Sequence, residues 1–233
     1  MLEDMAGLHN TATGTLVGRI LRLGLLGGLR SIEIDREEFR KHLGKRHGLW
    51  ISSFGEMHRV PTERLDTIAK ELIRETERLA MVEGAGFGFG GMITLIPDAG
   101  VLTLLTLRLI QKLCLLYGFQ DRGRSDSLEL WMAAATAAGV DYGKDLAGKQ
   151  ALEKIAPRLV ERLAVKIGQE AAQRWVCRLI PLASSALGGA LNFSFVRAWG
   201  RRVQGNLRAR HAATRPVNAN PPQAYAPARA VVD

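Results

Sequence analysis

The sequence predicts an all-α fold: a compact multi-helix bundle with two glycine-rich hydrophobic helical hairpins and a disordered C-terminal tail. Apolar side chains recur at helical spacing through most of the 233 residues, which favours about seven or eight helices. Proline and glycine stand where such helices are expected to begin and end. The length allows one large hydrophobic core or two small ones. Only two cysteines are present, which excludes a disulfide framework or a cysteine-rich zinc module.

Residues 1–60 predict an N-terminal helical region whose packing the sequence does not define. Within it, residues 15–29 place apolar side chains on one helical face with Arg19 and Arg22 at its flanks. This pattern fits either an interfacial amphipathic helix or a helix packed on the protein's own core. The two arginines interrupt the apolar run and no small-residue cleavage site follows, so we expect no cleaved secretory signal.

The clearest amphipathic helix begins at Pro61 and opens the main helical domain, which we expect to span residues 61–211. Charges are nearly balanced over residues 35–80, with ten basic and nine acidic side chains, as is typical of a solvated face. The expected core stripe of this helix comprises Leu65, Ile68, Leu72 and Leu79.

The first hydrophobic segment, residues 84–107, has Asp98 as its only ionisable group. A helix of this length would measure ~36 Å at ~1.5 Å per residue, enough to cross a hydrocarbon core of ~30 Å. Pro97 divides the segment into a glycine-rich half and a leucine-rich half. A new helix is therefore predicted to start at Pro97 and to stop at Gly118.

A second segment, residues 179–196, carries no charge and contains Pro181 near its start. Small residues four apart, such as Ser185 and Gly189, allow close helix approach. Each hydrophobic segment is consistent with a hairpin buried in the protein or with one inserted in lipid, and both interpretations stay open.

Three further stretches complete the predicted architecture. Residues 126–138 predict a short apolar helix that ends at Gly139. Residues 149–179 predict another amphipathic helix, kinked or split by Pro157. Residues 212–233 are rich in proline and alanine with almost no large apolar side chain, so we expect a disordered tail.

The formal net charge is +9, and residues 197–233 contribute +6 of it through seven arginines and one aspartate. Basic side chains that directly follow a hydrophobic segment are typical of an anchor on the cytoplasmic side of a membrane. Nucleic acid is an unlikely partner because no recognisable nucleic-acid-binding module is present. We expect contact with an anionic membrane surface through Arg197, Arg201, Arg202, Arg208 and Arg210.

The sequence contains no convincing motif for catalysis or for cofactor binding. Residues 86–91 fit G-x-G-x-x-G formally, but they follow a charged helix where a dinucleotide site needs a strand. The five histidines lack metal-ligand spacing and are expected at the solvated surface. Cys114 and Cys177 lie in apolar helical stretches, where a thiol packs as a small hydrophobe. We therefore predict no cofactor or metal, and the sequence identifies no small-molecule substrate.

Asp98 allows a sharper hypothesis. An acid within a hydrophobic segment would be a functional candidate if that segment lay in lipid. The favoured alternative is that Asp98 follows Pro97 at a helix start and complements the helix dipole.

The pattern of these segments resembles the EcsC family of bacterial proteins over residues 61–211. The resemblance implies association with the cell envelope, and the family takes its name from a gene beside those of an ABC transporter. It implies no catalytic residue, since none is established for the family. The residues that carry it, our candidates for a structural or functional motif, are Gly86, Gly88, Gly90, Gly91, Pro97, Asp98, Tyr117, Gly118, Pro181, Gly188, Gly189 and Asn192.

Three functional hypotheses follow. The first is a non-enzymatic protein on the cytoplasmic side of the bacterial inner membrane, with a scaffolding or accessory role in an envelope or transport process and an envelope or transporter component as protein partner. The second is a soluble, cytoplasmic helical module for protein–protein interaction. The third is an enzyme of unknown reaction with a site near Asp98.

Overall fold

The computed structural model describes residues 34–87, 95–119, 126–140, 155–175 and 185–214. All secondary structure in these ranges is helical, which confirms the all-α prediction. The elements are α2 (Arg36–His47), the 3₁₀ helix η1 (Phe54–Arg59), α3 (Thr62–Phe87), α4 (Leu95–Leu116), α5 (Asp126–Ala137), α7 (Ile155–Trp175) and α8 (Ser185–Thr214).

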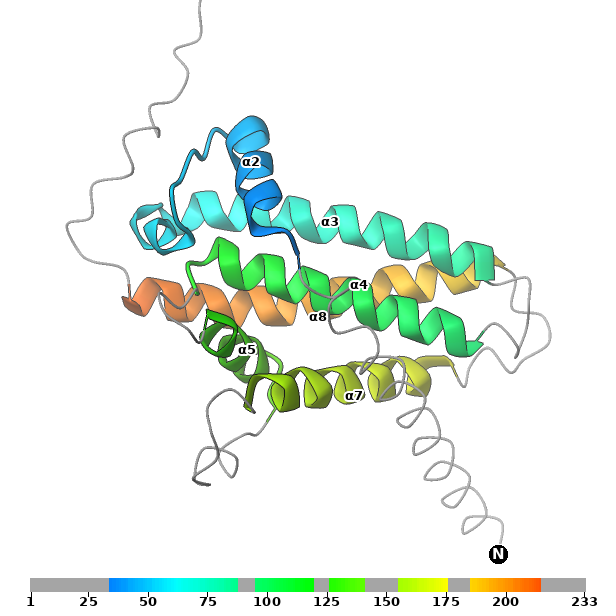
Figure 1. Cartoon of the computed structure of the whole chain (residues 1–233). Helices are drawn as coiled ribbons and strands as arrows, with labels where there is room; N and C mark the ends of the chain where they lie inside the picture. Colours follow the sequence, from blue (N-terminus) through cyan, green and yellow to red (C-terminus); the bar gives the residue numbers. More distant parts are fainter. Residues whose placement is uncertain (1–33, 88–94, 120–125, 141–154, 176–184, 215–233) are drawn as a thin grey trace, which may run out of the picture.

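Four long helices, α3, α4, α7 and α8, form the body of the bundle (Figure 1). The most extensive packing joins α3 and α8, and α4 contacts α3, α7 and α8. The short helix α2 crosses over α3, and α5 lies beside the start of α7. The end of α3, the start of α4, the end of α7 and the start of α8 gather at the right of Figure 1, so the bundle has two distinct ends.

Helix α2 is fixed at both ends by its sequence. The Asp35 carboxylate accepts hydrogen bonds from the backbone N–H groups of Glu37 and Glu38, at 2.8 and 3.0 Å, which satisfies donors of the first turn. Gly48 ends the helix in the left-handed conformation with φ 64°. The side chains of Phe39 and Leu43 are buried, so α2 belongs to the common core.

The predicted core stripe of α3 holds for its first three members and is wrong for Leu79. Leu65, Ile68 and Leu72 are buried, whereas Leu79 is 57% exposed. The last turn of α2 reaches only as far as Glu75, which pairs with Arg46. Leu79 lies one turn beyond this contact, where the stripe is exposed to solvent.

Helix α4 begins at Leu95, two residues before the predicted start. Pro97 still lies in the first turn, where its missing N–H would have no intrahelical acceptor. The predicted stop at Gly118 is confirmed, because this residue has φ 87°. The N–H groups of Gly118 and Phe119 donate to the carbonyls of Leu115 and Cys114, both at 3.0 Å, which forms a Schellman motif.

Helix α5 agrees with its prediction, and Gly139 ends it with φ 66°. Pro157 does not kink α7, because the helix begins at Ile155 and the proline falls in its first turn. The predicted split of the helix involves residues 149–154, which the structure does not describe. Residues 149–154 and the predicted tail from residue 215 onward lie outside the described residues, as do residues 1–33.

The core is continuous from η1 to α8. It contains Phe54 and Met57 of η1, Ile73 of α3 and Trp199 of α8. A Cβ added at Gly200 would lie 2.8 Å from Ile73 Cγ1, so this glycine lets α3 and α8 approach closely. Residues 34–60 therefore pack into the same core as the rest of the bundle.

Candidate functional site

The five arginines predicted to contact a membrane all lie on α8, which contains no acidic residue. Arg197 Nε lies 3.0 Å from Glu77 Oε1 on α3, and Arg208 Nε lies 2.8 Å from Asp66 Oδ2 on the same helix. Arg202 Nη1 lies 3.3 Å from Glu170 Oε1 on α7. These three arginines link α8 to α3 and to α7, while about half of each side chain stays exposed.

Arg201 and Arg210 differ from these three. Arg201 is exposed and makes no ion pair with the described residues. Arg210 places its guanidinium carbon 4.6 Å from the centroid of the Phe119 ring, a cation–π contact at the end of α4. Arg201 is therefore the arginine of this set whose charge is most available to a partner.

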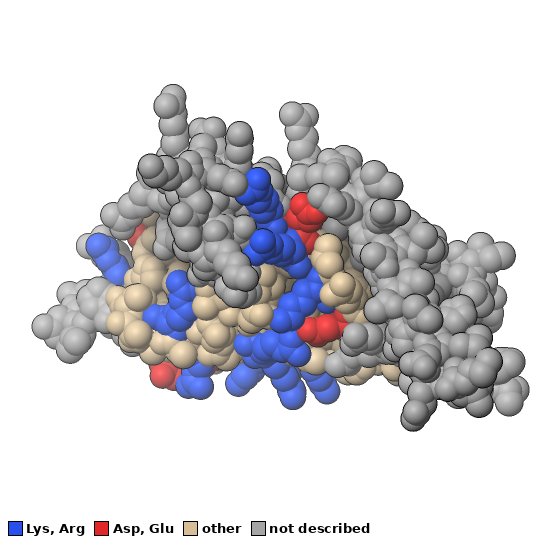
Figure 2. All heavy atoms as spheres, turned by 90° about the horizontal axis from the view of Figure 1, so that it is seen from below, with Lys and Arg blue, Asp and Glu red and all other residues tan. Residues whose placement is uncertain are grey.

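Sequence reasoning missed a second basic group, on α7. Arg158, Arg162 and Lys166 are spaced four residues apart, which places them on one helical face. Figure 2 shows Lys and Arg side chains gathered on the underside of the bundle, with fewer Asp and Glu among them. The four-residue spacing was the signal in the sequence that could have revealed this stripe.

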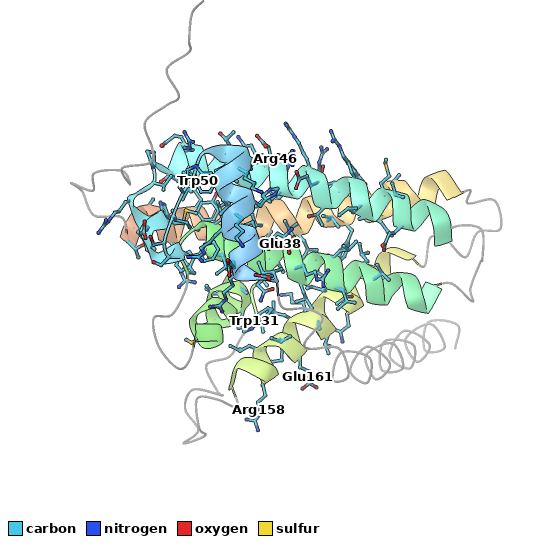
Figure 3. The ribbon with its side chains drawn as sticks, turned by 45° about the horizontal axis from the view of Figure 1, so that its top comes forward. Glu38, Arg46, Trp50, Trp131, Arg158 and Glu161 are labelled. Atoms are coloured by element: carbon cyan, nitrogen blue, oxygen red, sulfur yellow. The ribbon has the colours of Figure 1, made fainter. Side chains whose placement is uncertain are left out.

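A groove of about 740 Å³ runs beside this stripe, between α7 and the end of α5. Its walls include all three basic side chains and one acid, Glu161, together with Gly139 and Val140 at the end of α5. Lys166 Nζ donates to the carbonyl oxygen of Gly139 at 3.0 Å, which satisfies an acceptor at the end of α5. Arg158 and Glu161 project outward from α7 (Figure 3).

Tyr117 is fully buried and belongs to a polar network that joins three helices. Its hydroxyl donates to Asp66 Oδ1 at 2.6 Å, while Asp66 Oδ2 accepts from Arg208. Gln204 donates to the Asp66 carbonyl at 3.4 Å. Burial, and secondly the hydrogen bond to the Asp66 carboxylate, raise the pKa of the Tyr117 hydroxyl. The network therefore couples the end of α4 to α3 and α8.

His211 corrects the prediction that all histidines lie at the surface, since its side chain is fully buried. Its Nδ1 lies 3.1 Å from the carbonyl oxygen of Tyr117, and its Nε2 lies 3.3 Å from that of Val60. The His58 ring stacks on it with the centroids 5.5 Å apart. A Cβ at Gly118 would lie 2.9 Å from His58 Nε2, so the glycine also makes room for this stack.

The glycine-rich motif residues that the structure describes lie at the opposite end of the bundle. Gly188 and Gly189 are buried in the first turns of α8. A Cβ at Gly189 would lie 2.8 Å from the carbonyl oxygen of Met81, so the backbones of α3 and α8 meet there. Gly86 lies in the last turn of α3. Outside the described residues are Gly88, Gly90, Gly91 and Pro181.

The last turns of α3 expose three large apolar side chains. Leu79, Met81 and Val82 are 57%, 44% and 67% exposed. We call this cluster, with the adjoining ends of α3 and α8, the apolar end. Among the described helices, none combines the length and the hydrophobicity that crossing a membrane requires.

The two remaining motif residues occupy different positions. Asn192 is buried within α8. Asp98 lies in the first turn of α4, the position where an acid complements the helix dipole. The structure thus brings Tyr117 and Gly118 together with Arg208 and Arg210, and places Gly188 and Gly189 at the other end.

Cys114 is a free cysteine and is fully buried. Burial raises the pKa of the Cys114 thiol to about 12, so the nucleophilic thiolate is scarce at neutral pH. Within the described ranges, no three His, Cys, Asp or Glu side chains are grouped to hold a metal ion. Cys177 lies outside those ranges.

Comparison with known proteins identifies a family. No curated protein and no solved structure matches the chain significantly. The family model described as the EcsC protein family matches residues 29–211, a region that includes every helix described above except the last three residues of α8. The chain therefore belongs to the EcsC protein family.

Proposed function

We propose that this protein is a non-enzymatic, peripheral membrane protein that binds anionic lipid on the cytoplasmic side of a bacterial inner membrane. It serves there as a scaffold or accessory component of an envelope or transport process. The observation that carries the proposal is the charge of α8, which has five arginines and no acidic residue. Basic side chains near a membrane surface are attracted by anionic headgroups.

The ion pairs of α8 refine which side chains provide this attraction. Three of the five arginines form ion pairs with acids on α3 and α7, namely Arg197, Arg202 and Arg208. They therefore stabilise the bundle, and their paired acids reduce the positive charge that they add to the surface. Arg201 lies one turn beyond Arg197 and has no such acid among the described residues. We therefore assign the strongest single electrostatic contact to Arg201.

Charge reversal at Arg201 tests the proposal without breaking an ion pair. Full-length protein is sedimented with vesicles of phosphatidylglycerol and phosphatidylcholine, and we expect Arg201→Glu to weaken binding about tenfold. The matched control is Lys45→Glu, an exposed charge reversal on α2, which lies across the bundle from α7 (Figure 1). Equal effects of the two variants, or no binding by the unmodified protein, would contradict the proposal.

The groove between α5 and α7 favours a second candidate function, the binding of a protein partner with an acidic segment. Three basic side chains at helical spacing and a single acid, Glu161, line a volume of about 740 Å³, so basic groups predominate there. A photo-crosslinking residue in place of Gln169, which lines this groove, is expected to capture a partner in cells. Arg162→Glu should then abolish the crosslink, and a crosslink that survives it would argue against the groove.

A further inference from the structure

We infer that the apolar end is the part of the molecule that enters the membrane, and that Leu79 and Val82 insert at the boundary between headgroups and acyl chains. The inference rests on the proposed function, because it assumes that the protein binds lipid. The inference goes beyond the proposed function because it identifies the part of the fold that anchors the protein in the hydrophobic layer.

The first support is the exposed apolar surface itself. Leu79, Met81 and Val82 lie within one turn of α3 and are each more than two-fifths exposed. Single exposed apolar side chains are normal on a protein surface, whereas three of the four large apolar side chains most exposed among the described residues gather in this turn. The preceding apolar positions of α3, Leu72 and Ile73, are buried.

The second support is the charge that surrounds this surface. One face of α3 carries two arginines and two apolar side chains at helical spacing, namely Arg74, Arg78, Met81 and Val82. Both arginines are exposed and pair with no acid among the described residues. Apolar side chains beside arginines suit an anionic bilayer, because the guanidinium reaches headgroups while apolar atoms contact acyl chains.

The third support is the sequence that connects the helices at this end. Residues 88–94 join α3 to α4, and residues 176–184 join α7 to α8. Together they contain no Asp or Glu and one basic residue, Arg178. At the other end, residues 120–125 and 141–154 include the acids Asp121, Asp141, Asp145 and Glu153. The apolar character is thus concentrated at one end of the bundle.

A second copy of the chain fits this surface less well than lipid does. In a two-fold symmetric dimer the same patch meets itself, which brings Arg74 and Arg78 toward their counterparts in the partner. The nearest acids on α3, Glu71 and Glu75, already face His47 and Arg46 of α2, so these like charges would repel. An anionic bilayer has the complementary charge.

The test separates hydrophobic from electrostatic binding by means of salt. Full-length protein is sedimented with vesicles of phosphatidylglycerol and phosphatidylcholine, first at low and then at high salt. High salt screens the contribution of Arg201 but leaves hydrophobic insertion in place. The test variant is Leu79→Gln with Val82→Gln, and its control is Trp50→Gln, at an apolar side chain on the α2 side that is also 57% exposed.

We expect the unmodified protein and Arg201→Glu to keep a salt-resistant bound fraction. The double variant should lose that fraction and bind about tenfold more weakly, while Trp50→Gln should behave as the unmodified protein does. Unchanged thermal unfolding of the double variant would show that its fold is intact.

Three outcomes overturn the inference. Salt-resistant binding by the double variant would refute it while leaving the proposed function standing, provided that Arg201→Glu still weakens binding. An absence of vesicle binding by the unmodified protein would overturn both. A dimer of the unmodified protein that the double variant converts to a monomer, without lipid, would assign the surface to a second copy.

Discussion

The two ends of the bundle differ in which side chains they bury and which they expose. We call the end that contains Tyr117, Asp66 and His211 the polar end. At one end, the buried Tyr117 hydroxyl donates to Asp66, which also pairs with Arg208, and the His211 nitrogens face two backbone carbonyls. At the apolar end, the same α3 leaves Leu79 and Val82 in solvent. The helix pair α3 and α8 therefore supplies both a buried polar network at one end and an exposed apolar surface at the other.

The largest contrast is expected between two leucines of α3. Leu72 is 2% exposed and Leu79 is 57% exposed, although they are only seven residues apart. Leu72→Ala should lower the free energy of unfolding by about 2 to 5 kcal/mol through lost burial and a cavity. Leu79→Ala should change it by less than about 0.5 kcal/mol. Urea denaturation measures both, and similar losses would show that the apolar end is covered in solution.

The next largest effect is expected at the polar end. Asp66→Ala removes the acceptor of the Tyr117 hydroxyl and the ion-pair partner of Arg208. We expect a loss of about 2 to 3 kcal/mol in the free energy of unfolding, because a buried donor is left unpaired. Glu170→Ala is the control, since it removes the partially exposed Arg202 pair and should cost less than about 1 kcal/mol. Equal losses would mean that the network adds nothing beyond a surface ion pair.

The pH dependence of the free energy of unfolding tests the polar end in a second way. The pKa of Tyr117 is raised in the folded protein, so above pH of about 10 its hydroxyl ionises in the unfolded chain but stays protonated in the fold. The unfolded state then binds fewer protons, and stability falls as the pH rises. We expect a loss approaching about 1.4 kcal/mol per pH unit from this group. Tyr117→Phe should flatten the alkaline slope, and an unchanged slope would contradict the raised pKa of the buried Tyr117 hydroxyl.

The smallest perturbation uses a native thiol as a probe. Cys114 is fully buried in the last turn of α4, and its pKa is raised to about 12. In a Cys177→Ser background, we expect Cys114 to react with iodoacetamide only when the polar end opens. Asp66→Ala should accelerate labelling, whereas Leu79→Ala should leave the rate unchanged. Rapid labelling of Cys114 while Asp66 is unmodified would indicate that the polar end is open.

Local signals in the sequence predicted much of the fold. The stops at Gly118 and Gly139 follow from the left-handed backbone that glycine adopts, and both have positive φ. The start of α4 was placed within two residues because Pro97 suits only the first turn of a helix. These features depend on neighbouring residues, so they can be read without knowing the tertiary fold.

The features that the sequence left undefined depend on distant contacts. The exposure of Leu79 depends on which helices pack beside the last turns of α3, and helical spacing cannot reveal that arrangement. Arg197 and Glu77 are 120 residues apart, so nothing near the arginine indicates its partner. The burial of His211 requires the carbonyls of Tyr117 and Val60, which only the packed bundle brings together.

The most direct test of the account is amide hydrogen exchange of the full-length protein with and without vesicles that contain phosphatidylglycerol. If the apolar end enters the membrane, exchange should slow in the last turns of α3 and the first turns of α8. It should stay unchanged around Tyr117 and His211 at the polar end. Slower exchange at the polar end, or no change in the last turns of α3 when the protein is bound, would contradict the account.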